Sequence, residues 1–111
     1  MTNAILNGIA ASSGLVKAKA CVVLTRDDFS KFSAGSVLVT KVTDPSMIGV
    51  INKASAIVCD IGGITSHPSI IARELGIPCV VATKTATQDI NDGDLLEVNG
   101  STGQVMMLSG S

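Results

Sequence analysis

Aromatic residues and any excess of charge are both missing from this sequence. It has no Trp and no Tyr, and only two Phe residues, Phe29 and Phe32. Eight basic side chains nearly balance nine acidic ones, which gives a formal net charge of −1. Nucleic-acid binding normally needs a basic stripe for the phosphates, and single strands also need aromatic rings on which the bases stack. The composition therefore predicts a protein without a nucleic-acid partner.

Long hydrophobic runs are absent as well. Apolar residues make up 46% of the chain, but they occur in short blocks separated by polar turns. No block approaches the roughly 20 residues that a membrane-spanning helix requires. The first four residues lack the charged start of a signal peptide, and no long apolar stretch follows them. We expect a cytoplasmic protein with no membrane contact.

The three cysteines form no recognisable pair. Cys21, Cys59 and Cys79 are odd in number, widely spaced and free of any C-x-x-C motif, which argues against a disulfide framework or a paired metal site. Each borders a Val-rich block, so we interpret them as buried, reduced thiols. We expect no metal site, and a site that joins His67 to a cysteine is kept as a weaker alternative.

Short blocks rich in Val and Ile, bounded by Gly, Asp or Asn, predict strands. They lie at Lys19–Thr25, Ser36–Thr40, Ala56–Cys59, Cys79–Ala82, Leu95–Asn99 and Gln104–Leu108. The segment 100–103 between the last two is typical of a hairpin turn, and the Asn-Asp-Gly-Asp segment at 91–94 is typical of a tight turn.

Two helices are predicted between these strands. The first begins at Asp44-Pro45, because Asp caps free N–H groups and Pro suits the first helical position. The second runs from Pro68 to Leu75, and Gly76 suits the left-handed residue that often ends a helix. Helices that alternate with strands in a chain of 111 residues predict one α/β domain, a mixed sandwich.

The only histidine, His67, lies at the start of the second predicted helix. Pro68 disfavours a helical conformation for the residue before it, which places His67 about at the N-cap. The free N–H groups and the dipole at a helix start stabilise oxyanions. Imidazole is also a competent nucleophile near neutral pH, so a covalent phosphohistidine is chemically coherent at this position.

Other side chains around His67 fit the same chemistry. Gly62 and Gly63 permit close backbone approach, Thr65 and Ser66 offer hydroxyl donors, and the Arg73 guanidinium matches phosphate oxygens. A histidine near a helix start is nevertheless more often a cap or a surface group. A Gly-Gly turn and capping hydroxyls are equally ordinary before a helix. The residues alone leave both interpretations open.

The stretch GGITSHPSIIARELGIPCVV resembles the signature of the phosphohistidine domain of phosphoenolpyruvate (PEP)-utilising enzymes. That family includes pyruvate phosphate dikinase, PEP synthase, enzyme I of the sugar phosphotransferase system and rifampin phosphotransferase. The residues that match the signature are Gly62, Gly63, Thr65, Ser66, His67, Ile70 or Ile71, Ala72, Arg73, Gly76, Ile77 and Pro78. Pro68 and Ser69 depart from the commoner Ala-Ala, and the segments on either side are similar to the family over nearly the whole chain.

The resemblance implies a single swivelling β/β/α phosphohistidine domain over residues 1–111. It implies a phosphocarrier, the phosphohistidine part of a phosphotransferase of the kinase or dikinase type. His67 would accept and donate the phosphoryl group. The other site residues would stabilise the phosphate (Arg73, Thr65, Ser66) or shape the loop (Gly62, Gly63).

The chain contains no P-loop and no clustered carboxylates. We therefore expect no cofactor on this chain and no full reaction by this chain alone. ATP or PEP, together with Mg²⁺, is expected on partner domains or chains that bind nucleotide, PEP or pyruvate. The alternative is a non-catalytic interaction or regulatory module that keeps the fold, and the intact Thr-Ser-His and Arg set favours the carrier.

Overall fold

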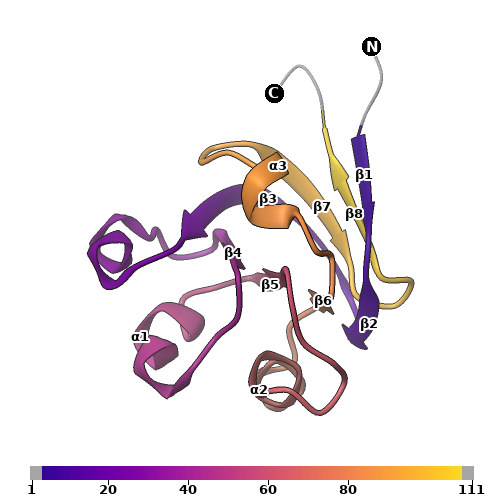
Figure 1. Ribbon diagram of the computed structural model, residues 1–111, viewed down its shortest axis with the longest axis horizontal. Coiled ribbons are helices and arrows are strands. Elements are labelled where there is room, and N and C mark those ends of the chain that lie inside the picture. Colours follow the sequence, from indigo (N-terminus) through magenta and orange to yellow (C-terminus); the bar gives the residue numbers. More distant parts are fainter. Residues whose placement is uncertain (1–3, 109–111) are drawn as a thin grey trace.

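The computed structural model describes residues 4–108 (Figure 1). Its eight strands are β1 (Ala4–Asn7), β2 (Ile9–Ser12), β3 (Leu15–Val23), β4 (Val37–Thr40), β5 (Ala56–Cys59), β6 (Cys79–Val81), β7 (Leu95–Asn99) and β8 (Gln104–Met107). The α-helices are α1 (Ile48–Ile51), α2 (His67–Leu75) and α3 (Ala86–Asp89), and two 3₁₀ helices are η1 (Arg26–Lys31) and η2 (Pro45–Met47).

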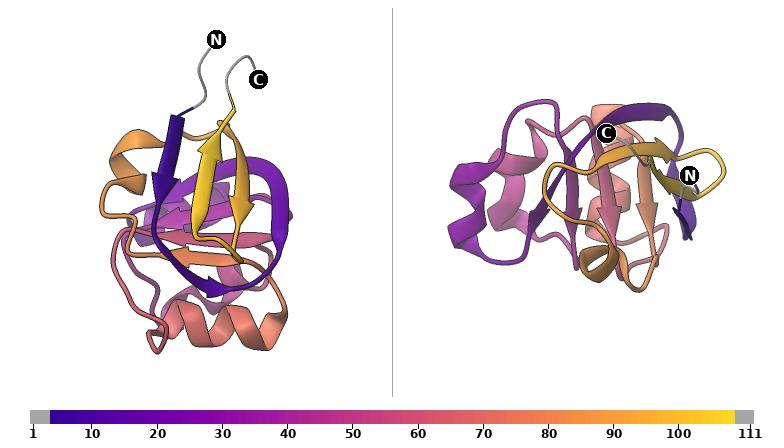
Figure 2. Two further views of the ribbon diagram at one scale, coloured as in Figure 1. Left: turned by 90° about the vertical axis from the view of Figure 1, so that its right-hand side faces the viewer. Right: turned by 90° about the horizontal axis from the view of Figure 1, so that it is seen from above.

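The strands form one sheet that folds into two layers. Their order is β1-β8-β7-β3-β4-β5-β6-β2, in which β3, β4, β5 and β6 run parallel and the other pairs are antiparallel. The long strand β3 joins the layers, since its first part pairs with β7 and its last part, from Ala20, pairs with β4. Figure 2 shows that the strands of the two layers cross steeply, while α2 lies beneath the parallel layer.

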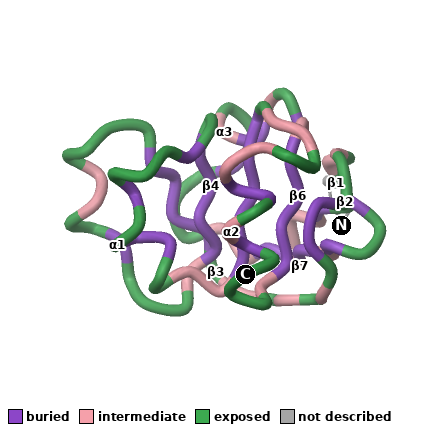
Figure 3. Tube along the Cα trace, turned by 90° about the horizontal axis from the view of Figure 1, so that it is seen from below, coloured by how far each residue is buried: buried purple, intermediate pink, exposed green. Residues whose placement is uncertain are grey.

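Alternation along the parallel strands creates two cores. In β4 and β5, Leu38 and Ile57 point toward α1 and α2, whereas Val39 and Val58 point toward the second layer and α3. The helix-side core includes Ile51 of α1. All of these side chains are fully buried. Figure 3 shows that buried residues dominate the strands of the parallel layer. The result is a sheet, sheet and helix arrangement, which confirms the β/β/α α/β fold predicted from the sequence.

The connection between β1 and β2 explains why this end of the chain was not predicted. Gly8 alone carries the chain from one edge of the sheet to the other, and a Cβ there would lie 2.3 Å from the Val81 carbonyl oxygen. Only glycine allows this close approach. Two strands of four residues each give too short an alternating pattern to separate them in the sequence.

The other predicted elements are largely confirmed. β5 and β7 have the predicted bounds, β4, β6 and β8 differ by a residue, and β3 starts four residues before the predicted Lys19. The first predicted helix is split into η2 and the single turn of α1, and η1 and α3 were not predicted. Asp44 caps η2 through Ser46 N–H, and Gly76 ends α2 with a φ of 72°.

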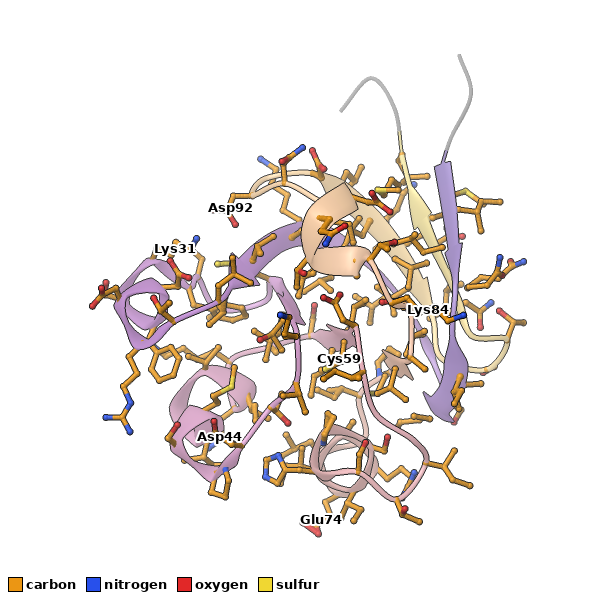
Figure 4. All side chains as sticks on the ribbon, in the orientation of Figure 1. Lys31, Asp44, Cys59, Glu74, Lys84 and Asp92 are labelled. Atoms are coloured by element: carbon orange, nitrogen blue, oxygen red, sulfur yellow. The ribbon has the colours of Figure 1, made fainter. Side chains whose placement is uncertain are left out.

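The cysteine prediction is confirmed, because all three thiols are free and buried. Cys59 lies at the end of β5 inside the helix-side core (Figure 4). Within residues 4–108, no helix is both long enough and apolar enough to cross a bilayer.

Candidate functional site

The candidate site lies at the carboxyl ends of β4 and β5. Thr40 and Cys59 are paired at these ends, so the loops that follow, 41–44 and 60–66, leave the same edge of the sheet. Backbone hydrogen bonds from Asp60 N–H to the Thr40 carbonyl and from Ile61 N–H to the Lys41 carbonyl keep the loops together. The carboxyl edge of parallel strands is where α/β folds place their ligands.

His67 projects from the start of α2 toward loop 41–44. Its Nδ1 atom lies 2.7 Å from the Thr43 hydroxyl oxygen, a hydrogen-bond distance between residues 24 positions apart. Thr43 is only 4% exposed, so its hydroxyl has little water to bind instead. The bond holds the imidazole by one nitrogen and leaves Nε2 as the other functional atom of the ring.

Thr43 is the functional residue that the sequence analysis missed. It belongs to the Thr-Asp-Pro segment, which was interpreted only as a helix start. The order of the predicted strands could have pointed to it. When two neighbouring strands run parallel, the loops that follow them leave the same edge of the sheet. A buried threonine directly after one strand could have been matched with the histidine after the next.

Only one of the two glycines in loop 60–66 has a backbone conformation that requires glycine. Gly62 has a φ of 132°, and a Cβ there would lie 2.8 Å from the Ser66 hydroxyl oxygen. The neighbouring Gly63 has an ordinary φ and open space around its Cα. Its carbonyl oxygen instead accepts from Ser66 N–H at 3.0 Å, Ser66 Oγ at 2.7 Å and Ser69 Oγ at 2.6 Å.

These bonds correct the expected start of the helix. Ser66 is the extended N-cap, and His67 is the first helical residue rather than the N-cap itself. The turn closed by the Gly63 carbonyl brings the chain into helical geometry one residue before Pro68, which overrides the local preference of the residue preceding proline. Within residues 4–108, the N–H group of His67 has no backbone acceptor, and it lies at the positive end of the helix dipole, where an oxyanion is stabilised.

Arg73 reaches back along α2, as expected, but its guanidinium binds backbone. Nη1 donates to the Ala11 carbonyl at 2.8 Å, and Nη2 donates to the Ile64 carbonyl at 2.7 Å. Thr65 lies next to Ile64 with its side chain exposed. The structure thus brings Thr65, Ser66 and His67 together at the start of α2, and it ties Arg73 to the loop beside them.

Two carboxylates flank the site, one exposed to solvent and one buried. Asp44 is exposed, and the hydrogen bonds from the Ser46 hydroxyl and N–H hold its pKa below the ordinary value of 3.8. Asp60 is buried and accepts from the N–H and hydroxyl of Thr87. Across residues 4–108, no three His, Cys, Asp or Glu side chains are grouped closely enough to hold a metal ion.

Two β-layers with α1 and α2 on one outer face, and a histidine at the start of the helix after the third parallel strand, define a β/β/α mobile domain. The chain belongs to the family described as PEP-utilising enzyme, mobile domain, whose profile matches residues 32–103. The family resemblance stated from the sequence is thereby confirmed.

The curated relatives are much longer proteins. The chain is 46% identical over 104 residues to an uncharacterised phosphotransferase, YvkC, of Bacillus subtilis, and 47% identical over 102 residues to the PEP synthase of Aeropyrum pernix. These matches cover 94% and 91% of this chain but 12% of each relative. The chain therefore corresponds to about an eighth of their length.

Solved structures show the same fold. An Enzyme I structure is 32% identical with a TM-score of 0.61, over 71% of this chain and 33% of that one. A UPF0107 protein superposes with a TM-score of 0.70 over 96% of this chain and 100% of that one. At 18% identity, the second similarity concerns the fold alone.

Proposed function

We propose that this domain is a phosphocarrier in which Nε2 of His67 takes up a phosphoryl group at one partner site and delivers it at another. The contact of 2.7 Å between Thr43 Oγ1 and His67 Nδ1 carries the proposal. It fixes the ring by one nitrogen at the start of a helix of nine residues and leaves the opposite nitrogen to react.

The transfer is a displacement at phosphorus. With the Nδ1 proton donated to Thr43 Oγ1, the lone pair of Nε2 forms the new N–P bond while the bond from phosphorus to the donor's leaving oxygen breaks. The electron pair departs with that oxygen, and the proton stays on Nδ1. The reverse displacement, by an acceptor oxygen, returns the imidazole to its starting state.

The start of α2 stabilises the negative charge of the transferred group. The N–H group of His67 and the positive end of the helix dipole lie at this helix start and are proposed to face the phosphoryl group. The exposed Thr65 hydroxyl is proposed to line the phosphoryl position. Ser66 and Gly62 shape the loop, because the Ser66 hydroxyl already binds the Gly63 carbonyl.

The donor and acceptor sites are proposed to lie on other domains. Relatives such as the PEP synthases carry this domain in chains about eight times longer, with room for nucleotide and PEP sites. Between Ala4 and Leu108, no group of three or more His, Cys, Asp or Glu side chains could hold Mg²⁺. We therefore assign ATP or PEP, with Mg²⁺, to partner domains in the cytoplasm.

The test is transfer of label to the domain. The chain is incubated with labelled PEP, or with ATP labelled at the β-phosphate, and a donor fragment of a PEP-utilising enzyme. The expected product is an acid-labile, alkali-stable label that is absent from His67→Ala. Equal labelling of His67→Ala would show that another residue carries the phosphoryl group, and no labelling of any variant would favour a non-catalytic module.

A further inference from the structure

The two hydrogen bonds of Arg73 connect parts of the chain that are far apart in sequence. One end of the guanidinium binds Ala11 in the edge strand β2, and the other binds Ile64 in loop 60–66. The bonds measure 2.8 Å and 2.7 Å, which are good lengths for a charged donor on a carbonyl oxygen. Arg73 therefore spans the gap between β2 and the loop that leads to His67.

The bond to Ala11 reaches a carbonyl group at an irregularity of the sheet. β2 pairs with β6 at Ala10 and again at Ser12, and the register shifts between these residues, so Ala11 is a bulge. Ala11 is 5% exposed, and a buried carbonyl without a partner is unfavourable. Arg73 Nη1 supplies a hydrogen bond to the Ala11 carbonyl at this bulge.

The bond to Ile64 anchors the loop at its middle. The preceding residue, Gly63, is already held by the hydroxyls of Ser66 and Ser69. Two successive carbonyls of the loop are thus tied to α2, one by its first turn and one by Arg73. His67 follows only three residues after Ile64, so the position of its imidazole depends on where this loop is held.

Arg73 is poorly placed to act on the imidazole directly. Six residues separate it from His67, which corresponds to about 240° around the helix and about 9 Å along it. The two side chains therefore leave α2 on different sides. Both terminal nitrogens of Arg73 are also engaged with backbone carbonyls.

We propose that Arg73 is a positioning residue that clamps the bulge of β2 to loop 60–66 and so sets the place of His67. The evidence for the clamp is the pair of hydrogen bonds that Arg73 makes in the chain without a phosphoryl group. Its effect on phosphoryl transfer rests on the function proposed above. This role differs from direct stabilisation of the phosphate, the role that the family resemblance implies for Arg73.

Hydrogen exchange tests the clamp without any phosphoryl chemistry. Arg73→Gln and Arg73→Lys are compared with the wild-type chain and with Arg26→Gln, which changes the only other arginine. We expect amide exchange to rise about tenfold or more in segments 9–12 and 60–66 of both Arg73 variants, and to stay unchanged in β4. Lys behaves like Gln because one ammonium cannot hold two carbonyls in a fork. Unchanged exchange in these two segments, or a uniform rise across the domain, would overturn the clamp.

Phosphoryl transfer then separates positioning from charge. Phosphoramidate, which transfers its phosphoryl group to imidazole with release of ammonia, serves as the donor. Both Arg73 variants should label about tenfold more slowly, while the hydrolysis rate of the phosphohistidine once formed stays that of wild type. Normal labelling by Arg73→Lys with a loss only in Arg73→Gln, or faster hydrolysis in both, would assign Arg73 to the phosphate and overturn positioning.

The exchange experiment and the labelling experiment give separate outcomes for the clamp and for the proposed function. If wild-type His67 takes no label from any donor, the proposed function fails, and the exchange experiment still decides the clamp. If Arg73→Gln does not fold, Arg73→Lys carries the test, because Lys keeps the positive charge and most of the side-chain length but loses the fork that holds both carbonyls. Faster exchange without slower labelling would overturn the positioning role and leave a structural one.

Discussion

Thr43 and His67 meet across two loops at the carboxyl edge of the parallel strands, with 2.7 Å between Oγ1 and Nδ1. Neither residue could reach the other without the pairing of β4 with β5. The buried hydroxyl fixes the rotation of the imidazole and distinguishes its two nitrogens, which a histidine exposed on an isolated helix could not achieve.

Replacing Thr43 by Val should slow phosphorylation of His67 about tenfold. The substitution keeps the shape of the buried side chain and removes the hydrogen bond, which is worth about 1 to 1.5 kcal/mol. Thr43→Ser should recover most of the rate, and Thr102→Val in the exposed turn should leave it unchanged. Initial rates of label incorporation measure the effect. A Thr43→Val variant that labels at the wild-type rate would remove Thr43 from the site.

Alanine should destabilise the fold at Gly62 and be tolerated at Gly63. Gly62→Ala places a Cβ 2.8 Å from Ser66 Oγ at a φ of 132°, which should lower the free energy of unfolding by about 1 to 3 kcal/mol. Gly63→Ala meets open space at an ordinary φ and should change it by less than about 0.5 kcal/mol. Urea unfolding of the matched pair gives the comparison, and equal stability of the two variants would contradict the described loop.

The Asp92 carboxylate should make the fold sensitive to acid. Lys31 donates to it at 2.8 Å, and this bond, followed by the bond from Val22 N–H, holds its pKa below the ordinary value of 3.8. Figure 4 labels both side chains of the pair. A carboxyl group with a lowered pKa contributes stability above its unfolded pKa and loses that contribution as the pH falls through the folded value. The free energy of unfolding should therefore fall between about pH 5 and about pH 2.

Asp92→Asn should flatten that decline. Asp27→Asn, which removes a charge from exposed η1 without touching Lys31, is the matched control and should keep the wild-type slope. Urea unfolding at a series of pH values measures both. A slope in Asp92→Asn as steep as that of wild type would show that the pair with Lys31 does not contribute.

The buried thiols should be inert in the native chain. Burial raises the pKa of Cys79 to about 12 and that of Cys59 well above its ordinary 9.0, and the thiolate is the reactive form. At about pH 8 a thiol reagent should label Cys59 and Cys79 far more slowly in the native state than in denaturant. Mass spectrometry assigns the sites. Rapid native labelling of Cys59 would contradict its place in the helix-side core.

The sequence was most informative where one local rule decides the structure. Gly76 at the end of α2 and the Asp44 cap of η2 were both predicted correctly. Each depends only on the conformation and hydrogen bonds of a few neighbouring residues. The strands β5 and β7 were predicted to the residue because turn residues bound them on both sides. The candidate site was found through His67 and its motif, and the structure brings Thr65 and Ser66 beside it.

The missing parts depend on contacts between distant segments. Thr43 becomes a partner of His67 only through the pairing of β4 and β5, and Arg73 meets Ala11 across 62 positions of sequence. β2 itself depends on the close packing of Gly8 against Val81. No periodicity or cap encodes such contacts, so sequence patterns could point to His67 as the proposed nucleophile and could not identify the residues that hold it.

The most direct measurement is NMR of the His67 imidazole in the chain, labelled with ¹⁵N, before and after phosphorylation. The account predicts a phosphoryl group on Nε2, seen as coupling between that nitrogen and ³¹P, and a proton retained on Nδ1. A phosphoryl group on Nδ1, or an imidazole that no phosphoryl donor modifies, would contradict it.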